Sequence, residues 1–301
     1  MPYIGRNTNV HMRGIVGYLV TPFTPEGAVD VGTLETLVDH LLDQGVQAMA
    51  PLGSTGESAY LNRDEWALVA ETTIGRTQGK VPVIVGASSM TTADTVEMCR
   101  QAQELGADAV MVLPISYWKL TDEEIFQHYR AISDAIDIPI MAYNNPATAG
   151  VDMSPELLVR MYRDIEHVTM VKESSGDIQR MHALHLKSGG ALPFFNGCNP
   201  LALEAFAAGA CGWCTAAPNL IGQPVQDMWR AVEANDFNTA RDLFMRHLDL
   251  LSFILAGGLP ATIKAGLSLQ GIPCGIPRLP LAPLGESDTR TLAQLLDTPH
   301  P

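Results

Sequence analysis

The chain has 301 residues, of which 47% are hydrophobic and 17% charged, so it carries enough apolar material for a large core. Its 33 acidic and 19 basic residues give a net charge of −14, which argues against nucleic acid or an anionic membrane surface as a partner. The stretch 1–13 is polar and has no apolar signal-peptide core, and no run of about 18 apolar residues predicts a membrane span. We therefore expect a cytoplasmic location.

Short apolar runs alternate with helical patterns along the chain. The run from Gly14 to Val20 predicts a first strand, and Asp30 is placed to cap a helix that Gly45 ends. Ser154-Pro155 marks the start of a later helix by its cap and first-turn proline. Further strands are expected at 48–52, 81–86, 109–114, 138–143, 168–171, 192–195 and 212–216. The other helices between strands are expected at about 63–77, 93–105, 121–136, 178–186 and 201–208.

This alternation predicts a (β/α)₈ barrel over 14–222. The strands are continuous apolar runs, which indicates burial on both faces, as in a parallel sheet. An open doubly wound sheet is the alternative, but no Gly-x-Gly-x-x-Gly follows the first strand. After Ile221 the pattern is helical only, which predicts a C-terminal extension over 223–301 that packs on the barrel and forms subunit contacts. Its helices are expected at 225–233, 237–255, 261–269 and 286–296, with the proline-rich stretch 273–283 before the last.

A lysine ends the sixth apolar run, in the stretch Val168-Thr-Met-Val-Lys-Glu-Ser-Ser-Gly176. Burying Lys172 as a cation is costly, so desolvation favours its neutral amine. A neutral amine in a cleft can attack a ketone and form a Schiff base, which is an electron sink for bond cleavage. Alternatively, the lysine extends from the strand end to solvent.

Polar side chains stand at the ends of the other strands, where the active site of such a barrel lies. We expect Tyr143 to act as the general acid and base beside Lys172, and Thr55 to relay its proton. The remaining strand ends supply Ser54, Tyr117, the pair Asn196-Gly197 and the pair Cys214-Thr215.

Four segments carry a resemblance to a known family: Gly53-Ser-Thr-Gly-Glu-Ser58, Tyr143-Asn-Asn-Pro146, Val171-Lys-Glu173 and Gly197. They resemble, in order and spacing from Gly14 to about Pro283, the dihydrodipicolinate synthase / N-acetylneuraminate lyase superfamily. The resemblance implies a barrel in which Lys172 forms an imine with pyruvate or another 2-oxo acid. Because the protonated imine is itself the electron sink, no metal or organic cofactor is expected.

The resemblance also implies roles for the other residues. Ser54 and Thr55 would bind the carboxylate of the 2-oxo acid, Tyr143 would move the proton, and Gly197 and Cys214 would line the pocket. Family members are commonly tetramers built from tight dimers, so a homotetramer is expected. In the synthases a tyrosine reaches into the site of the neighbouring subunit, and Tyr117 is its best match, with Ser116 as the alternative position.

One segment departs from the synthase pattern. The synthases carry an arginine shortly after Tyr-Asn-x-Pro, which holds the carboxylate of the second substrate, whereas this chain has Ala147-Thr148-Ala149-Gly150. Thr148 is expected to contact substrate there, but it cannot replace a bidentate cation. We therefore expect a Schiff-base lyase of the aldolase, dehydratase or deaminase type. A dihydrodipicolinate synthase that condenses pyruvate with aspartate semialdehyde, or a non-catalytic sensor of 2-oxo acids, is the alternative.

Other candidate motifs are interpreted as structural features without a direct catalytic or metal-binding role. The five cysteines are odd in number and scattered, which indicates free thiols. Cys211-Gly-Trp-Cys214 lies on a predicted strand, where residues three apart point to opposite faces and cannot chelate together. His182 and His185 lack a third ligand, so no metal site is expected. Glu57 and Glu173 are interpreted as hydrogen-bonding supports of the site.

Overall fold

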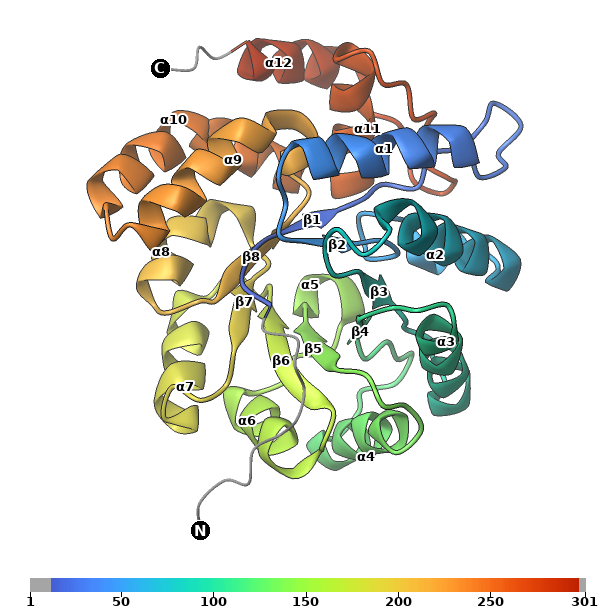
Figure 1. Cartoon of the computed structure of the whole chain (residues 1–301), viewed down its shortest axis with the longest axis vertical. Coiled ribbons are helices and arrows are strands. Elements are labelled where there is room, and N and C mark those ends of the chain that lie inside the picture. The colour runs from blue at the N-terminus through green and yellow to red at the C-terminus, as the bar shows by residue number, and fades with distance from the viewer. Residues whose placement is uncertain (1–11, 298–301) are drawn as a thin grey trace.

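The computed structural model describes residues 12–297, so the expected tail over 1–13 lies almost wholly outside the described part. Eight parallel strands occur within these residues, in the order β2-β1-β8-β7-β6-β5-β4-β3. A single bridge between Met49 and Val83 joins β2 to β3 and closes the ring (Figure 1). The predicted (β/α)₈ barrel is thus confirmed. Its strands are β1 Gly14–Tyr18, β2 Ala48–Ala50, β3 Ile84–Gly86, β4 Ala109–Val112, β5 Ile140–Asn144, β6 Val168–Glu173, β7 Phe194–Asn196 and β8 Gly212–Thr215.

Three strands begin later than the apolar runs predicted. Pro82, Pro139 and Pro193 each stand one or two residues before the first residue of β3, β5 and β7. Proline has no N–H to donate to a ladder, so pairing starts only beyond it. Apart from Thr169, every strand residue is buried, as the continuous apolar runs predicted.

Helices surround the barrel (Figure 1). Asp30 and Ser154 cap α1 and α6 as predicted, accepting the backbone N–H groups of Thr33 and Leu157. Three short elements in the loops after strands were not predicted: η1 Ser58–Tyr60, α5 Pro146–Ala149 and η2 Asn199–Leu201. The other barrel helices are α1 Val31–Asp43, α2 Arg63–Thr77, α3 Thr92–Glu104, α4 Asp122–Ser133, α6 Pro155–Asp164, α7 Ile178–Ser188 and α8 Ala202–Ala207.

The C-terminal part is helical, as expected, and packs on the barrel beside β1 and α1 (Figure 1). Its first helix, α9, runs across the expected boundary at 222 and is kinked at Ile221. The helices are α9 Pro218–Glu233, α10 Phe237–Ala256, α11 Leu259–Leu269 and α12 Glu286–Leu296.

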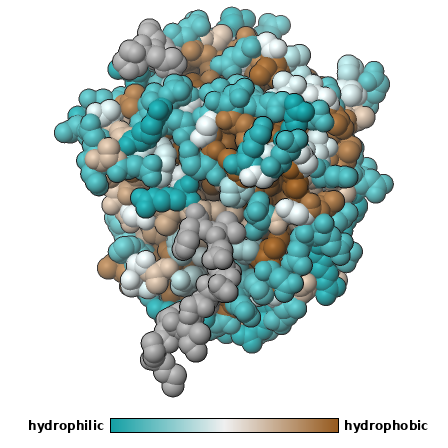
Figure 2. Space-filling view, in the orientation of Figure 1, coloured by the Kyte–Doolittle hydropathy of each residue, from teal (hydrophilic) through white to brown (hydrophobic). Residues whose placement is uncertain are grey.

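The surface is mixed in character. Figure 2 shows hydrophilic residues over most of one face, with hydrophobic residues in patches between them. Of the helices between residues 12 and 297, none combines the length and the apolar character that a membrane crossing requires.

Candidate active site

Lys172 lies inside the mouth of the barrel, at the C-terminal end of β6. Its neighbour in the β5 ladder is Tyr143, because the two strands pair in a register that places these residues opposite each other. Lys172 is only 5% exposed, and its Nζ lies 3.9 Å from the ring centroids of both Tyr18 and Tyr143. The lysine therefore stays inside the barrel instead of extending to solvent, and it is held between two aromatic faces.

A cavity of about 500 Å³ opens above this lysine. Most residues expected at the site line it together: Ser54, Thr55, Tyr143, Thr148, Lys172, Gly197 and Cys214. Tyr117 is different, since it is 86% exposed on the loop after β4 and packs edge-to-face on Trp118. Tyr117 does not line the cavity of its own chain.

The two tyrosines that face Lys172 are in different electrostatic states. Burial raises the pKa of Tyr143, but Lys172 and hydrogen bonds with Asn145, Ser54 and Lys172 outweigh burial and leave the pKa below its usual value. The clearest of these contacts is the donation from Asn145 Nδ2 to Tyr143 Oη at 2.8 Å. The Tyr143 hydroxyl, which lies beside the amine, therefore loses its proton more readily than an ordinary tyrosine does.

Tyr18 has the opposite tendency. Burial, followed by the neighbouring Cys214 and Tyr143, raises its pKa well above the usual value, and its hydroxyl donates to Met111 Sδ at 2.9 Å. Burial also raises the pKa of Cys214 to about 11, although Lys172 partly opposes this effect. Tyr18 and Cys214 are therefore neutral wall residues near pH 7, and Tyr143 is the more acidic of the two tyrosine hydroxyls beside Lys172.

Two glycines are required by close packing at the site. An added Cβ at Gly197 would lie 1.7 Å from Ser174 Oγ and 2.8 Å from Lys172 Cε, so glycine leaves the space that the lysine occupies. At Gly56 a Cβ would lie 3.0 Å from the backbone nitrogen of Leu52. The tight turn that presents Ser54 and Thr55 depends on this absence of a side chain.

Glu57 and Glu173 are fully buried next to the site and are held by hydrogen bonds, as predicted. Glu173 accepts from Asn144 Nδ2 at 3.1 Å, from the Ser175 backbone at 2.7 Å and from Arg180 Nε at 3.3 Å. Glu57 lies 2.6 Å from Lys264 Nζ. Neither Glu57 nor Glu173 lines the cavity around Lys172, although Glu57 lines an adjoining cavity of about 310 Å³ that shares Ser54 and Tyr143 with it.

The sequence did not reveal several cavity residues. Tyr18 lies inside the first apolar run, where no local signal distinguishes it, whereas Asn145 could have been noticed as the second asparagine of Tyr-Asn-Asn-Pro. No local signal pointed to the C-terminal extension, which lines the cavity with Leu255, Gly258, Leu259 and Pro260. The extension was expected to form subunit contacts, and the structure adds that it forms one wall of this cavity.

The cavity is polar near the barrel and apolar toward the extension. Among the described residues that line it, Lys172 is the single cationic side chain. The segment 147–149, where the synthases carry an arginine, contributes Ala147 and Thr148. A second carboxylate in this cavity would therefore lack a cationic partner.

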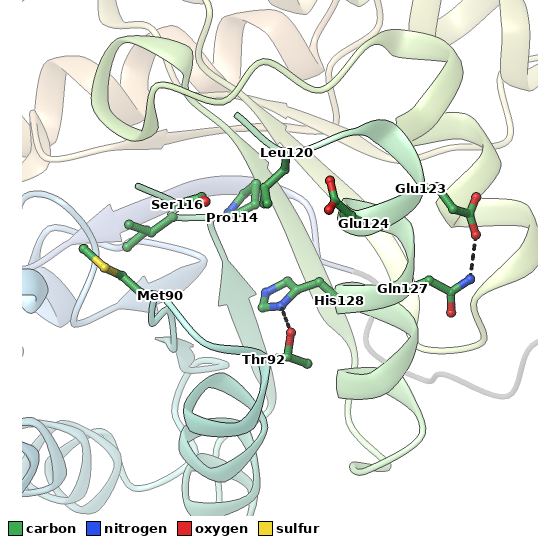
Figure 3. A pocket seen from close by; sticks show the side chains of 10 residues that line it. Met90, Thr92, Pro114, Ser116, Leu120, Glu123, Glu124, Gln127 and His128 are labelled. Carbon is green, nitrogen blue, oxygen red and sulfur yellow. Dashed lines mark hydrogen bonds between the residues drawn. The ribbon is translucent and has the colours of Figure 1, made fainter. Parts of the chain in front are cut away.

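A second cavity, of about 490 Å³, lies between the start of α4 and the loops after β3 and β4 (Figure 3). Its carboxylates are already engaged: Glu123 accepts from Gln127 and pairs with Arg160, and Glu124 accepts from Thr121. Burial lowers the pKa of His128 in its wall to about 4, so this imidazole is neutral near pH 7. Among the described residues that line this cavity there is no lysine or cysteine.

The cysteines and histidines that the sequence singled out do not form a site. Cys211 and Cys214 are both free, and only Cys214 lines the cavity around Lys172. Among residues 12–297, no group of three or more His, Cys, Asp or Glu side chains is arranged to hold a metal ion.

The chain is similar to known proteins along nearly its whole length. The model of the dihydrodipicolinate synthetase family matches residues 11–298. The 4-hydroxy-tetrahydrodipicolinate synthase of Pelobacter propionicus is 34% identical over 284 residues, covering 94% of this chain and 97% of that protein. The enzyme of the same name from Bacillus subtilis is 31% identical over 278 residues, covering 92% and 96%.

Solved structures agree with these matches. A putative dihydrodipicolinate synthetase from Pseudomonas aeruginosa superposes with a TM-score of 0.95 at 54% identity, covering 96% of this chain and 99% of that one. Dihydrodipicolinate synthase from Aquifex aeolicus superposes with a TM-score of 0.91 at 29% identity, covering 95% and 97%. The chain therefore belongs to the dihydrodipicolinate synthetase family and is an enzyme of the lyase class that forms Schiff bases.

Proposed function

We propose that Lys172 forms the imine, with the keto carbon of pyruvate or a related 2-oxo acid. The observation that carries this proposal is the burial of the Lys172 amine between Tyr18 and Tyr143 at the base of a cavity of about 500 Å³. The amine adds to the carbonyl carbon, the carbonyl oxygen leaves as water, and a protonated imine remains. Loss of a proton from the adjacent carbon then gives an enamine, and neither step needs a metal or an organic cofactor.

The other residues of the cavity have separate proposed roles. Ser54 and Thr55 bind the carboxylate from the turn after β2, across the barrel from Lys172. Tyr143 carries the proton, for which its lowered pKa suits it, and Thr55 relays that proton. Gly197, Cys214 and Thr148 complete the wall around the substrate.

The second part of the substrate is proposed to lack a carboxylate. Lys172 is the single cation among the described lining residues and is occupied by the imine, so aspartate semialdehyde would have no cationic partner for its carboxylate. Hydroxyl and amide groups of Asn145, Thr148 and Ser174 suit a hydroxylated 2-oxo acid or a cyclic imine instead. Such a substrate would be cleaved by retro-aldol reaction, dehydration or deamination. A second candidate function is that of a 4-hydroxy-tetrahydrodipicolinate synthase, which the names of the relatives from Pelobacter propionicus and Bacillus subtilis favour.

We also propose a cytoplasmic homotetramer built from two tight dimers. Tyr117 would then enter the cavity of a neighbouring subunit and act there as a further catalytic hydroxyl. Its 86% exposure and its absence from the lining of its own cavity support this placement.

Borohydride trapping tests the imine directly. The protein is incubated with pyruvate, reduced, and weighed as the intact chain and as peptides. We expect a mass gain of one reduced pyruvate on the peptide that contains Lys172, and no gain in Lys172→Ala, which should also lose turnover. Lys187→Ala serves as the control, because Lys187 forms an exposed ion pair with Glu156 on the outer helices. No adduct with any 2-oxo acid would favour the non-catalytic sensor, and an adduct on another lysine would disprove the role of Lys172.

A further inference from the structure

Glu173 follows Lys172 directly in β6, and Asn144 follows Tyr143 in β5. The register that pairs Tyr143 with Lys172 pairs Asn144 with Glu173 one residue further along. Successive strand residues point to opposite faces, so the first pair faces the cavity and the second faces the helices outside the barrel. Each residue of the proposed catalytic pair therefore has a buried polar neighbour behind it.

These neighbours form a clamp across the two strands. Asn144 Nδ2 donates to Glu173 Oε2 at 3.1 Å, and Asn144 Oδ1 accepts from the Met153 backbone at 2.9 Å. The backbone N–H of Ser174 donates to the Asn144 carbonyl at 2.9 Å. A clamp of this kind keeps the ends of β5 and β6 in the register that brings Tyr143 to Lys172.

Arg180, in the first turn of α7, supplies the positive charge of this clamp. Its Nε lies 3.3 Å from Glu173 Oε2, its guanidinium lies 3.0 Å from Asp152 Oδ1, and it also donates to the Met153 carbonyl. The side chain of Glu173 is fully buried, whereas those of Arg180 and Asp152 are 15% and 54% exposed. The Asp152 charge is therefore well solvated, and the Glu173 charge depends on Arg180.

We infer that Arg180 is a positioning residue for the imine chemistry: it neutralises Glu173 so that the adjacent Lys172 can react as a neutral amine, and it secures the Glu173–Asn144 clamp. This inference rests on the proposed role of Lys172. The other titratable groups around Lys172 are Tyr18 on β1, Tyr143 on β5 and Cys214 on β8, while Cys198 faces Glu173 from the loop after β7. We expect all of these groups to keep their positions when Arg180 is changed.

The sign of the effect follows from the charges. Without Arg180 the negative Glu173 would stabilise the ammonium form of Lys172, so a higher pH would be needed to obtain the reactive amine. A purely structural loss would instead lower the reaction rate by the same factor at every pH. The pH dependence of imine formation thus separates the two roles.

The experiment measures the rate of borohydride trapping with pyruvate between pH 5 and pH 10 in the full-length protein. For Arg180→Met we expect the midpoint to rise by about one pH unit, and trapping near pH 7 to slow by about tenfold. Arg180→Lys should restore most of the wild-type profile. The double variant Arg180→Met/Glu173→Gln, which removes both charges, should return the midpoint toward wild type.

Two further variants keep the test decisive. Lys187→Met removes a cation from the same helix whose partner, Glu156, is exposed, so its profile should match wild type. Glu173→Gln alone leaves Arg180 paired only with the solvated Asp152 and should move the midpoint to lower pH, which gives a result of opposite sign if Arg180→Met does not fold. Equal slowing at all pH values, or midpoints that do not move in Arg180→Met and Glu173→Gln, would overturn the inference while leaving the imine intact. Absence of a wild-type adduct would overturn the imine and this inference together.

Discussion

Two buried glutamates support the two segments on which the proposed chemistry depends, and their partners come from different parts of the chain. Glu173 stands behind Lys172, and its partners Asn144, Ser175 and Arg180 all belong to neighbouring β5–α7 segments of the barrel. Glu57 stands behind Ser54 and Thr55, and its partners come from the C-terminal extension. Lys264 of α11 lies 2.6 Å from Glu57 Oε1. The backbone N–H of Arg278 donates to Glu57 Oε2 at 2.7 Å.

The difference shows how the extension takes part in the site. Lys264 is 1% exposed, and burial lowers its pKa although Glu57 opposes that effect. One turn earlier in the same helix, Leu259 and Pro260 line the cavity. The Glu57–Lys264 pair thus joins the proposed carboxylate-binding turn to the opposite wall of the cavity. The part of the cavity around Lys172, here called the Lys172 end, is supported by residues of the barrel. The part around Ser54 and Thr55, here called the carboxylate end, is supported by residues of the extension.

The largest expected effect on stability comes from breaking the ion pair between Glu57 and Lys264. Lys264→Met would leave Glu57 charged, buried and without its cation, which should reduce the free energy of unfolding by about 3–5 kcal/mol. Urea unfolding at pH 7 measures this loss. Glu57→Gln/Lys264→Met should recover part of it, because neither of these two positions then carries a buried charge.

Arg230→Met provides the control for the Lys264 variant. Arg230 pairs with Asp227 at 2.6 Å, but its side chain is 61% exposed, so the loss should stay within about 1 kcal/mol. Equal losses in Lys264→Met and Arg230→Met would show that the buried pair contributes no more than a surface one. The attachment of the extension to the barrel would then depend on apolar packing and on the Arg278–Glu65 pair instead.

The barrel and the residues around Lys172 could be predicted because the sequence signals for them lie within short, continuous stretches of the chain. Continuous apolar runs mark the buried strands, and polar residues directly after those runs mark the site, so Lys172, Tyr143, Ser54 and Thr55 were found from the sequence. The pairing of Tyr143 with Lys172 then follows from two strands that are neighbours in both sequence and space.

The rest depends on contacts between distant segments. Tyr18 reads as one more apolar strand residue, and only closure of the barrel brings it to Lys172. Lys264 lies in an apolar helical pattern, and nothing near it in the sequence indicates Glu57 as its partner. Leu259 and Pro260 have no feature that distinguishes a cavity wall from a subunit contact. Packing of the extension decides their role.

A second prediction tests whether Asn145, two residues after Tyr143 in the chain, helps to lower the Tyr143 pKa. Asn145 donates to Tyr143 Oη at 2.8 Å and accepts from the Thr148 backbone as the cap of α5. Asn145→Ala removes a hydrogen bond to the charged form of Tyr143, so the Tyr143 pKa should rise by about one unit. The ultraviolet absorbance of tyrosinate, titrated with pH and referenced to Tyr143→Phe, measures this shift.

Asn145→Asp separates this effect from loss of the helix cap. The aspartate still accepts from Thr148, but it cannot donate to Tyr143 and adds a negative charge, so it should raise the Tyr143 pKa at least as far as alanine does. Coincident titration curves for wild type and Asn145→Ala would mean that Lys172 and Ser54 hold the Tyr143 pKa down without help from Asn145.

The smallest expected effect concerns His128, a half-buried titratable group that lies outside the cavity around Lys172. Its Nδ1 lies 3.0 Å from Thr92 Oγ1, and burial lowers its pKa to about 4 (Figure 3). This folded-state pKa lies below the unfolded value of about 6.5, so on acidification the unfolded chain binds a proton first. Stability is therefore lost as the pH falls from about 6.5 to about 4, and the loss stops below that.

Unfolding by urea at pH 7 and at pH 4.5 measures the His128 contribution. Glu123 and Glu124, whose pKa values are lowered by hydrogen bonds with Gln127 and Thr121 respectively, begin to lose their stabilising contribution only at the acidic end of this range, near pH 4.5. They do so equally in wild type and in His128→Gln, so their effect cancels in the comparison. We expect His128→Gln to lose less stability than wild type by roughly 1 kcal/mol, since the imidazole is partly solvated. Equal losses of unfolding free energy in the two proteins would show that His128 binds its proton as readily in the folded state as in the unfolded state. Burial would then not lower the His128 pKa.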